Sequence, residues 1–217
     1  MPPISGRGAE HTIDRFHRLY YDAEKDGGTW RDTRFMGVLT RKCPLDLWIY
    51  QEMIFELEPD LIVECGTAFG GSALFLACTC DQVGQGRVVS IDIATSNDLP
   101  QHPRIQYLVG SSTSSGVVDQ IRSLVDEARR VMVILDSDHS KDHVLAELRL
   151  YAPLVGTGSY VVVEDTNVNG HPVMADFGPG PMEAIDQFMT ESDDFVIDRS
   201  REKFLLTFNP RGFLRRR

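Results

Sequence analysis

Several features that would point to a membrane, secreted or metal-thiolate protein are missing from this sequence. It has no apolar run approaching the roughly 20 residues of a membrane span. Its first residues, MPPISGRGAEHTIDRFH, contain no apolar core of a secretory signal. The four cysteines (Cys43, Cys65, Cys78 and Cys80) do not form a C-x-x-C pair. We therefore expect a cytoplasmic protein with reduced thiols and no membrane partner.

Positive charge is also scarce. The chain has 22 Lys and Arg against 32 Asp and Glu, a net charge of −10, which argues against nucleic-acid binding through a basic face. The exception is the tail RGFLRRR at 211–217, interpreted as a solvated or subunit-contacting terminus, or else as a phosphate-binding arm. We find no internal repeat or low-complexity linker, and 217 residues suit one domain.

Apolar strands and helices alternate from residue 59 onward, which predicts an α/β fold with a mostly parallel sheet and helices on both faces. Residues 1–58 are expected to form a helical and irregular extension on the core at 59–217, with a helix over 11–26 stopped by Gly27–Gly28. A second helix, 45–58, is expected in the extension, and the expected core helices are 71–80, 115–129, 141–150 and 181–190. The expected strands are 60–65, 87–92, 105–109, 131–135 and 159–164, followed by an antiparallel C-terminal hairpin of 194–198 and 203–208.

A glycine-rich turn follows the first core strand, in the run LIVECGTAFGGSALFLA at 61–77. It has neither the G-x-G-x-x-G spacing of a dinucleotide site nor a triphosphate loop. Glu64 at the strand end favours a cationic ligand over a polyphosphate, and Asp92 ends the next strand, where it can meet a ribose. The E-x-G-x-x-x-G pattern is similar to motif I of class I S-adenosylmethionine (SAM) methyltransferases. A plain turn of a Rossmann-like domain is the alternative.

Carboxylates follow two further strands, in Asp136-Ser137-Asp138-His139 and in Glu164-Asp165. Both clusters should face the same edge of the sheet as the glycine turn. Carboxylates that converge repel one another unless a cation lies between them, and an all-oxygen set favours Mg²⁺, or Mn²⁺ or Ca²⁺, over zinc. Helix caps or solvated loop acids are the alternative.

Histidines and a long loop lie near these acids. His139 precedes the helix at 141–150 and is either a general base or a hydrogen-bonded loop residue. His143 is interpreted as a helix-surface residue. The loop 166–180 is either a lid or a structural loop, and its Asn169 and His171 are candidate substrate contacts.

Longer strings carry a family resemblance. The runs VILDSDHSKDHVLAELRLYAPLVGTGSYVVVEDTNVNGHP at 133–172, FGPGPMEAIDQF at 177–188 and EKFLLTFNPRGFLRR at 202–216 closely resemble the cephalosporin hydroxylase / rhamnosyl O-methyltransferase family. The resemblance extends from about Trp30 to Arg216. It implies a Rossmann-like class I methyltransferase fold with a seven-stranded sheet, and a homo-oligomer.

The resemblance also implies roles for particular residues. The metal ligands would be Asp136, Glu164 and Asp165, binding Mg²⁺ or Mn²⁺. The residues that would bind S-adenosylmethionine are Glu64, Gly66, Thr67, Gly70, Ser72, Asp92, Ser111 and Ser112. Catechol-type relatives have a lysine base three positions after the metal aspartate, where this chain has His139, so the base stays open between His139 and, second, His171.

The expected activity is O-methylation of a hydroxyl on a small molecule or sugar, such as a rhamnosyl group. Asp136 would hold the ion that binds the hydroxyl, and His139 would take its proton. Two alternatives are the methyltransferase component of a cephalosporin-type methoxylation or hydroxylation system, and a non-catalytic SAM-binding partner protein. Oxidative iron chemistry is discounted because a 2-His-1-carboxylate signature is missing.

Overall fold

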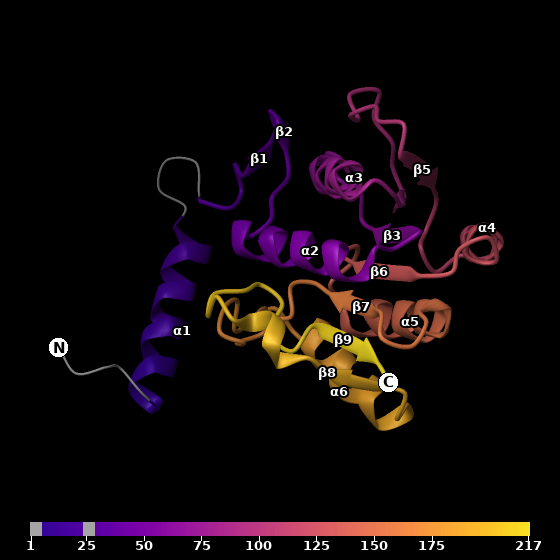
Figure 1. Cartoon of the computed structure of the whole chain (residues 1–217). Coiled ribbons are helices and arrows are strands. Elements are labelled where there is room, and N and C mark those ends of the chain that lie inside the picture. The colour runs from indigo at the N-terminus through magenta and orange to yellow at the C-terminus, as the bar shows by residue number, and fades with distance from the viewer. Residues whose placement is uncertain (1–5, 24–28) are drawn as a thin grey trace.

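A computed structural model of the chain describes residues 6–23 and 29–217. Its centre is a seven-stranded sheet in the order β5-β4-β3-β6-β7-β9-β8 (Figure 1). The strands β5, β4, β3, β6 and β7 run parallel, whereas β9 is antiparallel to both neighbours. The strand bounds are β3 (Leu61–Cys65), β4 (Arg87–Asp92), β5 (Ile105–Val109), β6 (Val131–Leu135), β7 (Tyr160–Val163), β8 (Phe195–Ile197) and β9 (Phe213–Arg216). This is the expected class I methyltransferase architecture.

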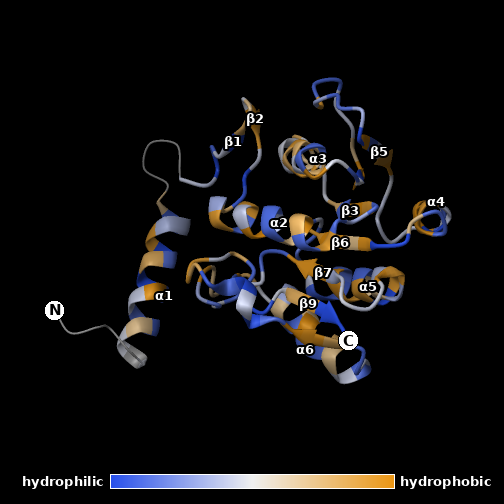
Figure 2. Cartoon of the chain, in the orientation of Figure 1, coloured by the Kyte–Doolittle hydropathy of each residue, from blue (hydrophilic) through white to orange (hydrophobic). Residues whose placement is uncertain are grey.

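Helices cover both faces of the sheet, because the central strands are apolar on both sides (Figure 2). Alternate residues of β3 show this: Ile62 packs with α2 and α3, whereas Val63 packs with α4, α5 and α6. The main helices are α1 (Arg7–Asp22), α2 (Pro44–Leu57), α3 (Gly71–Val83), α4 (Ser115–Val125), α5 (Lys141–Tyr151) and α6 (Pro181–Glu191). The 3-10 helices are η1 (Ala152–Leu154) and η2 (Arg199–Glu202).

The N-terminal part of the chain is attached to the core through aromatic packing. Tyr21 of α1 forms a buried cluster with Cys43, Val168 and Phe208. The expected helix over 11–26 begins earlier and ends at Asp22, and its expected stop at Gly27–Gly28 lies outside the described residues. Two short strands that were not expected, β1 (Arg34–Phe35) and β2 (Val38–Leu39), form a small antiparallel hairpin before α2.

The C-terminal hairpin is present, but its second strand was placed wrongly. Residues 203–208 form no strand, and β9 at Phe213–Arg216 pairs with both β7 and β8. The apolar run at 203–208 serves a different contact: Leu206 and Phe208 pack in the α1 cluster. Phe213 and Leu214 are fully buried instead, because β9 lies between two strands.

Within residues 6–23 and 29–217, no helix has both the length and the apolar character that crossing a bilayer requires.

Candidate active site

The glycine turn between β3 and α3 lies directly against the end of β6. Gly66 has a φ of +103°, and a Cβ atom added there would come within 1.9 Å of the Asp136 carbonyl oxygen. Gly70 has a φ of +76°, and its Cβ would meet the Pro100 ring at 2.7 Å. A side chain at Gly66 would force the two backbone segments apart, and one at Gly70 would clash with the Pro100 ring. Gly66 therefore allows the turn to lie against Asp136, the first of the acids after β6.

Asp92, at the end of β4, holds this turn in place. Its Oδ2 accepts hydrogen bonds from the backbone amides of Thr67 at 3.0 Å and Ala68 at 2.9 Å. Its Oδ1 accepts from the Ala94 amide at 3.1 Å. A carboxylate with these three donors is fixed in direction, and it faces a cavity at the strand ends.

That cavity has a volume of about 390 Å³ and lies where the parallel strands end, which is the usual ligand position in open α/β sheets. Four of the residues expected to bind the cofactor line it: Gly66, Asp92, Ser111 and Ser112. Sequence reasoning did not assign the remaining lining residues to the cofactor. They are Ala68, Ile91, Ile93, Gly110, Asp136, Ser137, Asp138 and His143.

The other expected cofactor residues do not line the cavity. Glu64 is fully buried in β3 and accepts a hydrogen bond from Ser90 Oγ at 2.6 Å. Thr67 Oγ1 lies 2.7 Å from the same Ser90 hydroxyl. Ser72 is buried in the first turn of α3, and Gly70 precedes that helix. These four residues belong to the strand, the turn and the helix start but not to the cavity wall. Direct contact with a cofactor stays a prediction for them.

Buried Glu147 joins two sides of the cavity. It accepts hydrogen bonds from Ser112 Oγ at 2.5 Å and Ser137 Oγ at 2.7 Å. His143, one turn earlier on α5, lies 3.2 Å from Ser112 Oγ and lines the cavity. His143 was interpreted as a helix-surface residue, and its side chain is 24% exposed, but it also contacts the cavity. Its spacing of four from Glu147 was a readable signal, because such pairs share a helix face.

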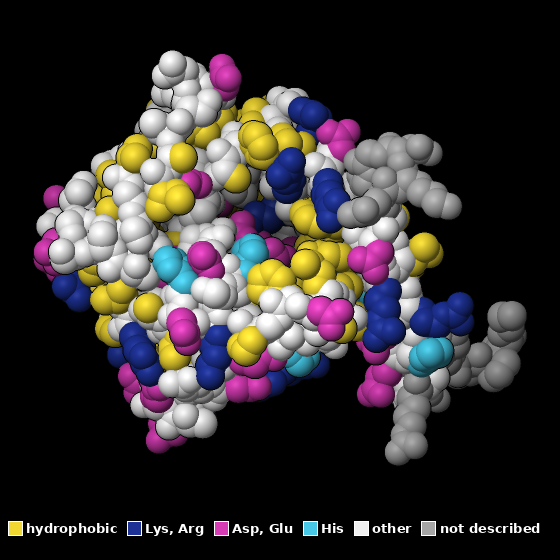
Figure 3. Space-filling view, turned by 180° about the vertical axis from the view of Figure 1, so that it is seen from behind, with side chains coloured by type: hydrophobic (Ala, Val, Ile, Leu, Met, Phe, Trp, Pro, Cys, Tyr) yellow, Lys and Arg dark blue, Asp and Glu magenta, His cyan; other side chains and the backbone are white. Residues whose placement is uncertain are grey.

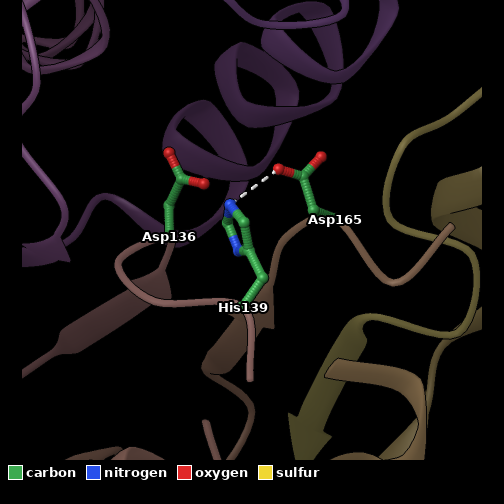
Figure 4. A group of neighbouring side chains, drawn as sticks. All are labelled: Asp136, His139 and Asp165. Atoms are coloured by element: carbon green, nitrogen blue, oxygen red, sulfur yellow. Dashed lines mark ion pairs between the residues drawn. The ribbon is translucent and has the colours of Figure 1, made fainter. Parts of the chain in front are cut away.

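A second group of polar side chains stands beside this cavity and shares Asp136 with it. Ligand atoms of Asp136, His139 and Asp165 all lie within 4.8 Å of one another (Figure 4). His139 lies in the loop before α5, as expected, and its Nε2 is 3.1 Å from Asp165 Oδ2. The two carboxylates are ligands that suit Mg²⁺ or Mn²⁺, whereas an imidazole nitrogen is more typical of zinc or iron sites. From behind, the molecule shows a hollow around which acidic and histidine side chains gather (Figure 3).

The charges of this group are strongly interdependent. Burial opposes the His139 charge, but the charge and hydrogen bond of Asp165, together with the Asp136 charge, raise the pKa of His139 to about 9. Burial also acts to raise the pKa of Asp165, but His139 outweighs it and lowers that pKa below its ordinary value. Without a cation on the carboxylates, His139 is therefore protonated near neutral pH.

Glu164, the third expected metal ligand, has other partners. Its Oε1 accepts a hydrogen bond from Tyr50 Oη at 2.9 Å, and its Oε2 lies 2.6 Å from Lys42 Nζ. Lys42 also contacts Asp136 Oδ2. Burial acts to lower the pKa of Lys42, but Asp136 and Glu164 raise it above its ordinary value. The sequence did not identify Lys42 as part of this site. It lies in the irregular segment before α2.

Asn209 links Tyr50 to the backbone of Asp165. Its Nδ2 donates to Tyr50 Oη at 2.9 Å, and its Oδ1 accepts from the Asp165 amide at 3.1 Å. Asp165 has a φ of +52°, a left-handed conformation that costs a non-glycine residue energy. The buried Asn209 amide supports that conformation and so aims the Asp165 carboxylate.

The two candidate substrate contacts of the 166–180 loop do not join this group. Asn169 Nδ2 donates to Glu183 Oε1 at 3.2 Å, and His171 Nε2 lies 2.8 Å from the same oxygen. His171 lines a different cavity, of about 360 Å³, beside α1. Because Glu183 belongs to α6, these two contacts attach the loop to that helix. Contact with a substrate stays a prediction for both residues.

Comparison with known proteins gives a consistent result. Residues 27–217 match the family described as Rhamnosyl O-methyltransferase/CmcI. A rhamnosyl O-methyltransferase of Mycobacterium leprae is 42% identical over 217 residues, which cover 97% of this chain and 93% of the relative. One of Mycobacterium bovis is 41% identical over 215 residues, covering 96% and 86%.

Solved structures agree on the fold. A cmcI structure with Mg and SAM has a TM-score of 0.68 at 19% identity, covering 92% of this chain and 83% of that one. An apo structure of CmcI has a TM-score of 0.66 at 22% identity, covering 91% and 82%.

Proposed function

The chain belongs to the Rhamnosyl O-methyltransferase/CmcI family, and on that premise we propose that it transfers the methyl group of S-adenosylmethionine to a sugar hydroxyl with the help of a divalent cation. Rhamnosyl groups are the first acceptors to examine, because the curated relatives carry that name. The observation that carries the proposal is the double position of Asp136, which both lines the cavity and belongs to the acid–histidine group.

The cavity is suited to bind the methyl donor. Asp92 directs its carboxylate to the place where ribose hydroxyls sit in such folds, and the acids along the wall favour a cationic sulfonium over a phosphate. Ser111 and Ser112 also line this cavity and would face the adenosine. A methyl donor bound here would present its reactive end toward Asp136, so the acceptor approaches from the side of His139 and Asp165.

The acid–histidine group is suited to bind and deprotonate the acceptor hydroxyl. Asp136 and Asp165, with Glu164, would hold Mg²⁺ or Mn²⁺, and such an ion lowers the pKa of a bound hydroxyl. A cation there would also reduce the negative charge that raises the His139 pKa. His139 Nε2 would then be free to take the hydroxyl proton, and the oxygen would attack the methyl carbon.

The test is conversion of S-adenosylmethionine to S-adenosylhomocysteine by the purified full chain, with a panel of rhamnosyl and other sugar acceptors. We expect product formation with at least one rhamnosyl acceptor, its loss on adding EDTA, and its recovery with excess Mg²⁺ or Mn²⁺. Binding of S-adenosylmethionine without turnover on any acceptor would instead favour a non-catalytic partner protein. Turnover on a cephalosporin-type acceptor alone would favour the methoxylation component. Homo-oligomer formation stays a prediction that light scattering can measure.

A further inference from the structure

Lys42 contacts the acid group from a segment that precedes all strands of the seven-stranded sheet in the sequence. It stands in the segment between β2 and α2, and its side chain is only 5% exposed. Its ammonium group contacts Asp136, which follows β6, and Glu164, which follows β7, the latter at 2.6 Å. A buried ammonium between two carboxylates from neighbouring strands occupies the kind of position that a metal cation takes.

This contact changes which oxygens are available. Both carboxylate oxygens of Glu164 have a partner, Tyr50 on Oε1 and Lys42 on Oε2. The ligand atoms that lie close together belong to Asp136, His139 and Asp165. A divalent ion that recruits Glu164 as well, as the family resemblance implies, must approach an oxygen that already contacts Lys42 or Tyr50.

We propose that Lys42 is an internal counter-cation, which offsets part of the charge of Asp136 and Glu164 before the divalent ion arrives and which the ion displaces when it binds both carboxylates. This inference rests on the proposed function, because it concerns the ion that this function requires. Lys42 is thus a positioning residue that keeps the ligands together and sets the affinity for the ion.

Removing the Lys42 charge should have opposite effects on the stability of the ion-free protein and on its affinity for the ion. Without the ion, loss of the ammonium leaves two buried carboxylates facing each other, and the folded protein is destabilised. With the ion, loss of the ammonium removes a competing positive charge and frees Glu164, so the ion binds more tightly. A lysine with a purely structural role produces the first effect without the second.

The experiment titrates Mn²⁺ into the metal-stripped full chain and follows binding by calorimetry and by electron paramagnetic resonance. The variants are Lys42→Met, which keeps the length but removes the charge, and Lys42→Arg, which keeps the charge. Lys203→Met is the matched control, because it breaks an exposed lysine–carboxylate pair with Glu52. Melting temperatures are measured with and without saturating Mn²⁺.

We expect Lys42→Met to bind Mn²⁺ about tenfold more tightly or better, equal to 1.4 kcal/mol or more. It should melt at a lower temperature than wild type without the ion and regain most of that loss with it. Lys42→Arg should bind within about threefold of wild type, a difference below 1.4 kcal/mol. Lys203→Met should change neither the affinity nor the response to the ion.

Unchanged or weaker Mn²⁺ binding by Lys42→Met overturns the inference, as does a melting loss that saturating Mn²⁺ leaves in place. If Lys42→Met does not fold, Lys42→Gln removes the charge while keeping a donor, and the same affinity criterion applies. The two proposals fail separately. Tighter binding without methyl transfer in any acceptor assay contradicts only the proposed function, whereas methyl transfer by wild type without tighter binding contradicts only the role of Lys42.

Discussion

His139 Nε2 lies 3.1 Å from Asp165 Oδ2, although the two residues follow different strands, β6 and β7. The Asp165 carboxylate both orients the imidazole and favours its protonated form. The same carboxylate is a candidate metal ligand. A cation on Asp165 would therefore weaken its hold on the His139 proton, so that metal binding and the readiness of the base are linked through one side chain.

Replacing His139 tests its role as the base. His139→Gln should lower kcat by about 10²–10⁴-fold, the usual contribution of a general base. Affinity for S-adenosylmethionine should stay within about twofold, because His139 does not line the cavity. Steady-state kinetics and calorimetry measure the two quantities. His102→Gln is the matched control, since His102 pairs with Asp81 away from this group. A kcat near the wild-type value would assign the base elsewhere.

Asp92 offers a test that concerns the methyl donor alone. Asp92→Ala removes the acceptor for the Thr67 and Ala68 amides as well as the carboxylate that faces the ribose position. We expect S-adenosylmethionine to bind at least about tenfold more weakly, a loss of about 1.4 kcal/mol or more, as measured by calorimetry. Asp98→Ala, at an exposed position in the following loop, should bind like wild type. Equal affinity in the two variants would contradict the assignment of this cavity to the cofactor.

Asn209 tests how the Asp165 backbone is supported. Asn209→Ala leaves the Asp165 amide without its partner and removes one of the two hydrogen bonds of the Tyr50 hydroxyl, which should lower the free energy of unfolding by about 1–3 kcal/mol. The activity should fall as well, because Asp165 can leave its left-handed conformation. Urea unfolding measures the first effect, with exposed Asn97→Ala as the control. Unchanged stability and activity would show that other contacts hold Asp165.

The sequence predicted those parts of the site that depend on one local segment. The apolar run at β3, its glycine turn and the acids after β6 and β7 each have a short pattern, and parallel strands bring their ends to one edge. Lys42 has no such pattern: its partners lie 94 and 122 positions further along the chain. Only the folded chain reveals that its charge balances theirs.

The error at the C-terminus has a similar cause. Residues 203–208 (KFLLTF) form a longer and more apolar run than residues 213–216 (FLRR), so that the local sequence favours a strand in the first place. The choice depends on α1, which provides aromatic partners for Phe208 and so draws the first run out of the sheet. The contact of His143 with the cavity side chain Ser112 could not be predicted for a related reason, because Ser112 lies 31 positions away from it in the chain.

The docking of α1 should depend on pH through His17. This residue is only 4% exposed, stacks on Phe208, and lies 2.9 Å from Asn167 Nδ2 through its Nε2. The Asn167 amide donates this hydrogen bond, so Nε2 must carry a lone pair and the ring must be neutral. Burial accordingly lowers the pKa of His17 to about 4, although Asp14 and Asp165 oppose the shift.

The sign follows from proton uptake. In the unfolded chain His17 titrates near its ordinary value of 6.5, so between pH 6.5 and about 4 the unfolded state binds more protons than the folded state. The contribution of neutral His17 to stability is therefore fully present above pH 6.5 and is lost as the pH drops through this window, by about 2 kcal/mol at pH 5.

Because His17 belongs to α1, hydrogen exchange of Arg7–Asp22 should speed up first, and urea unfolding at pH 7 and pH 5 gives the size of the loss. His17→Leu should be less sensitive to this change of pH than wild type, whereas His11→Leu, on the exposed side of α1, should behave like wild type. An identical loss in wild type and His17→Leu would assign the acid sensitivity to other groups.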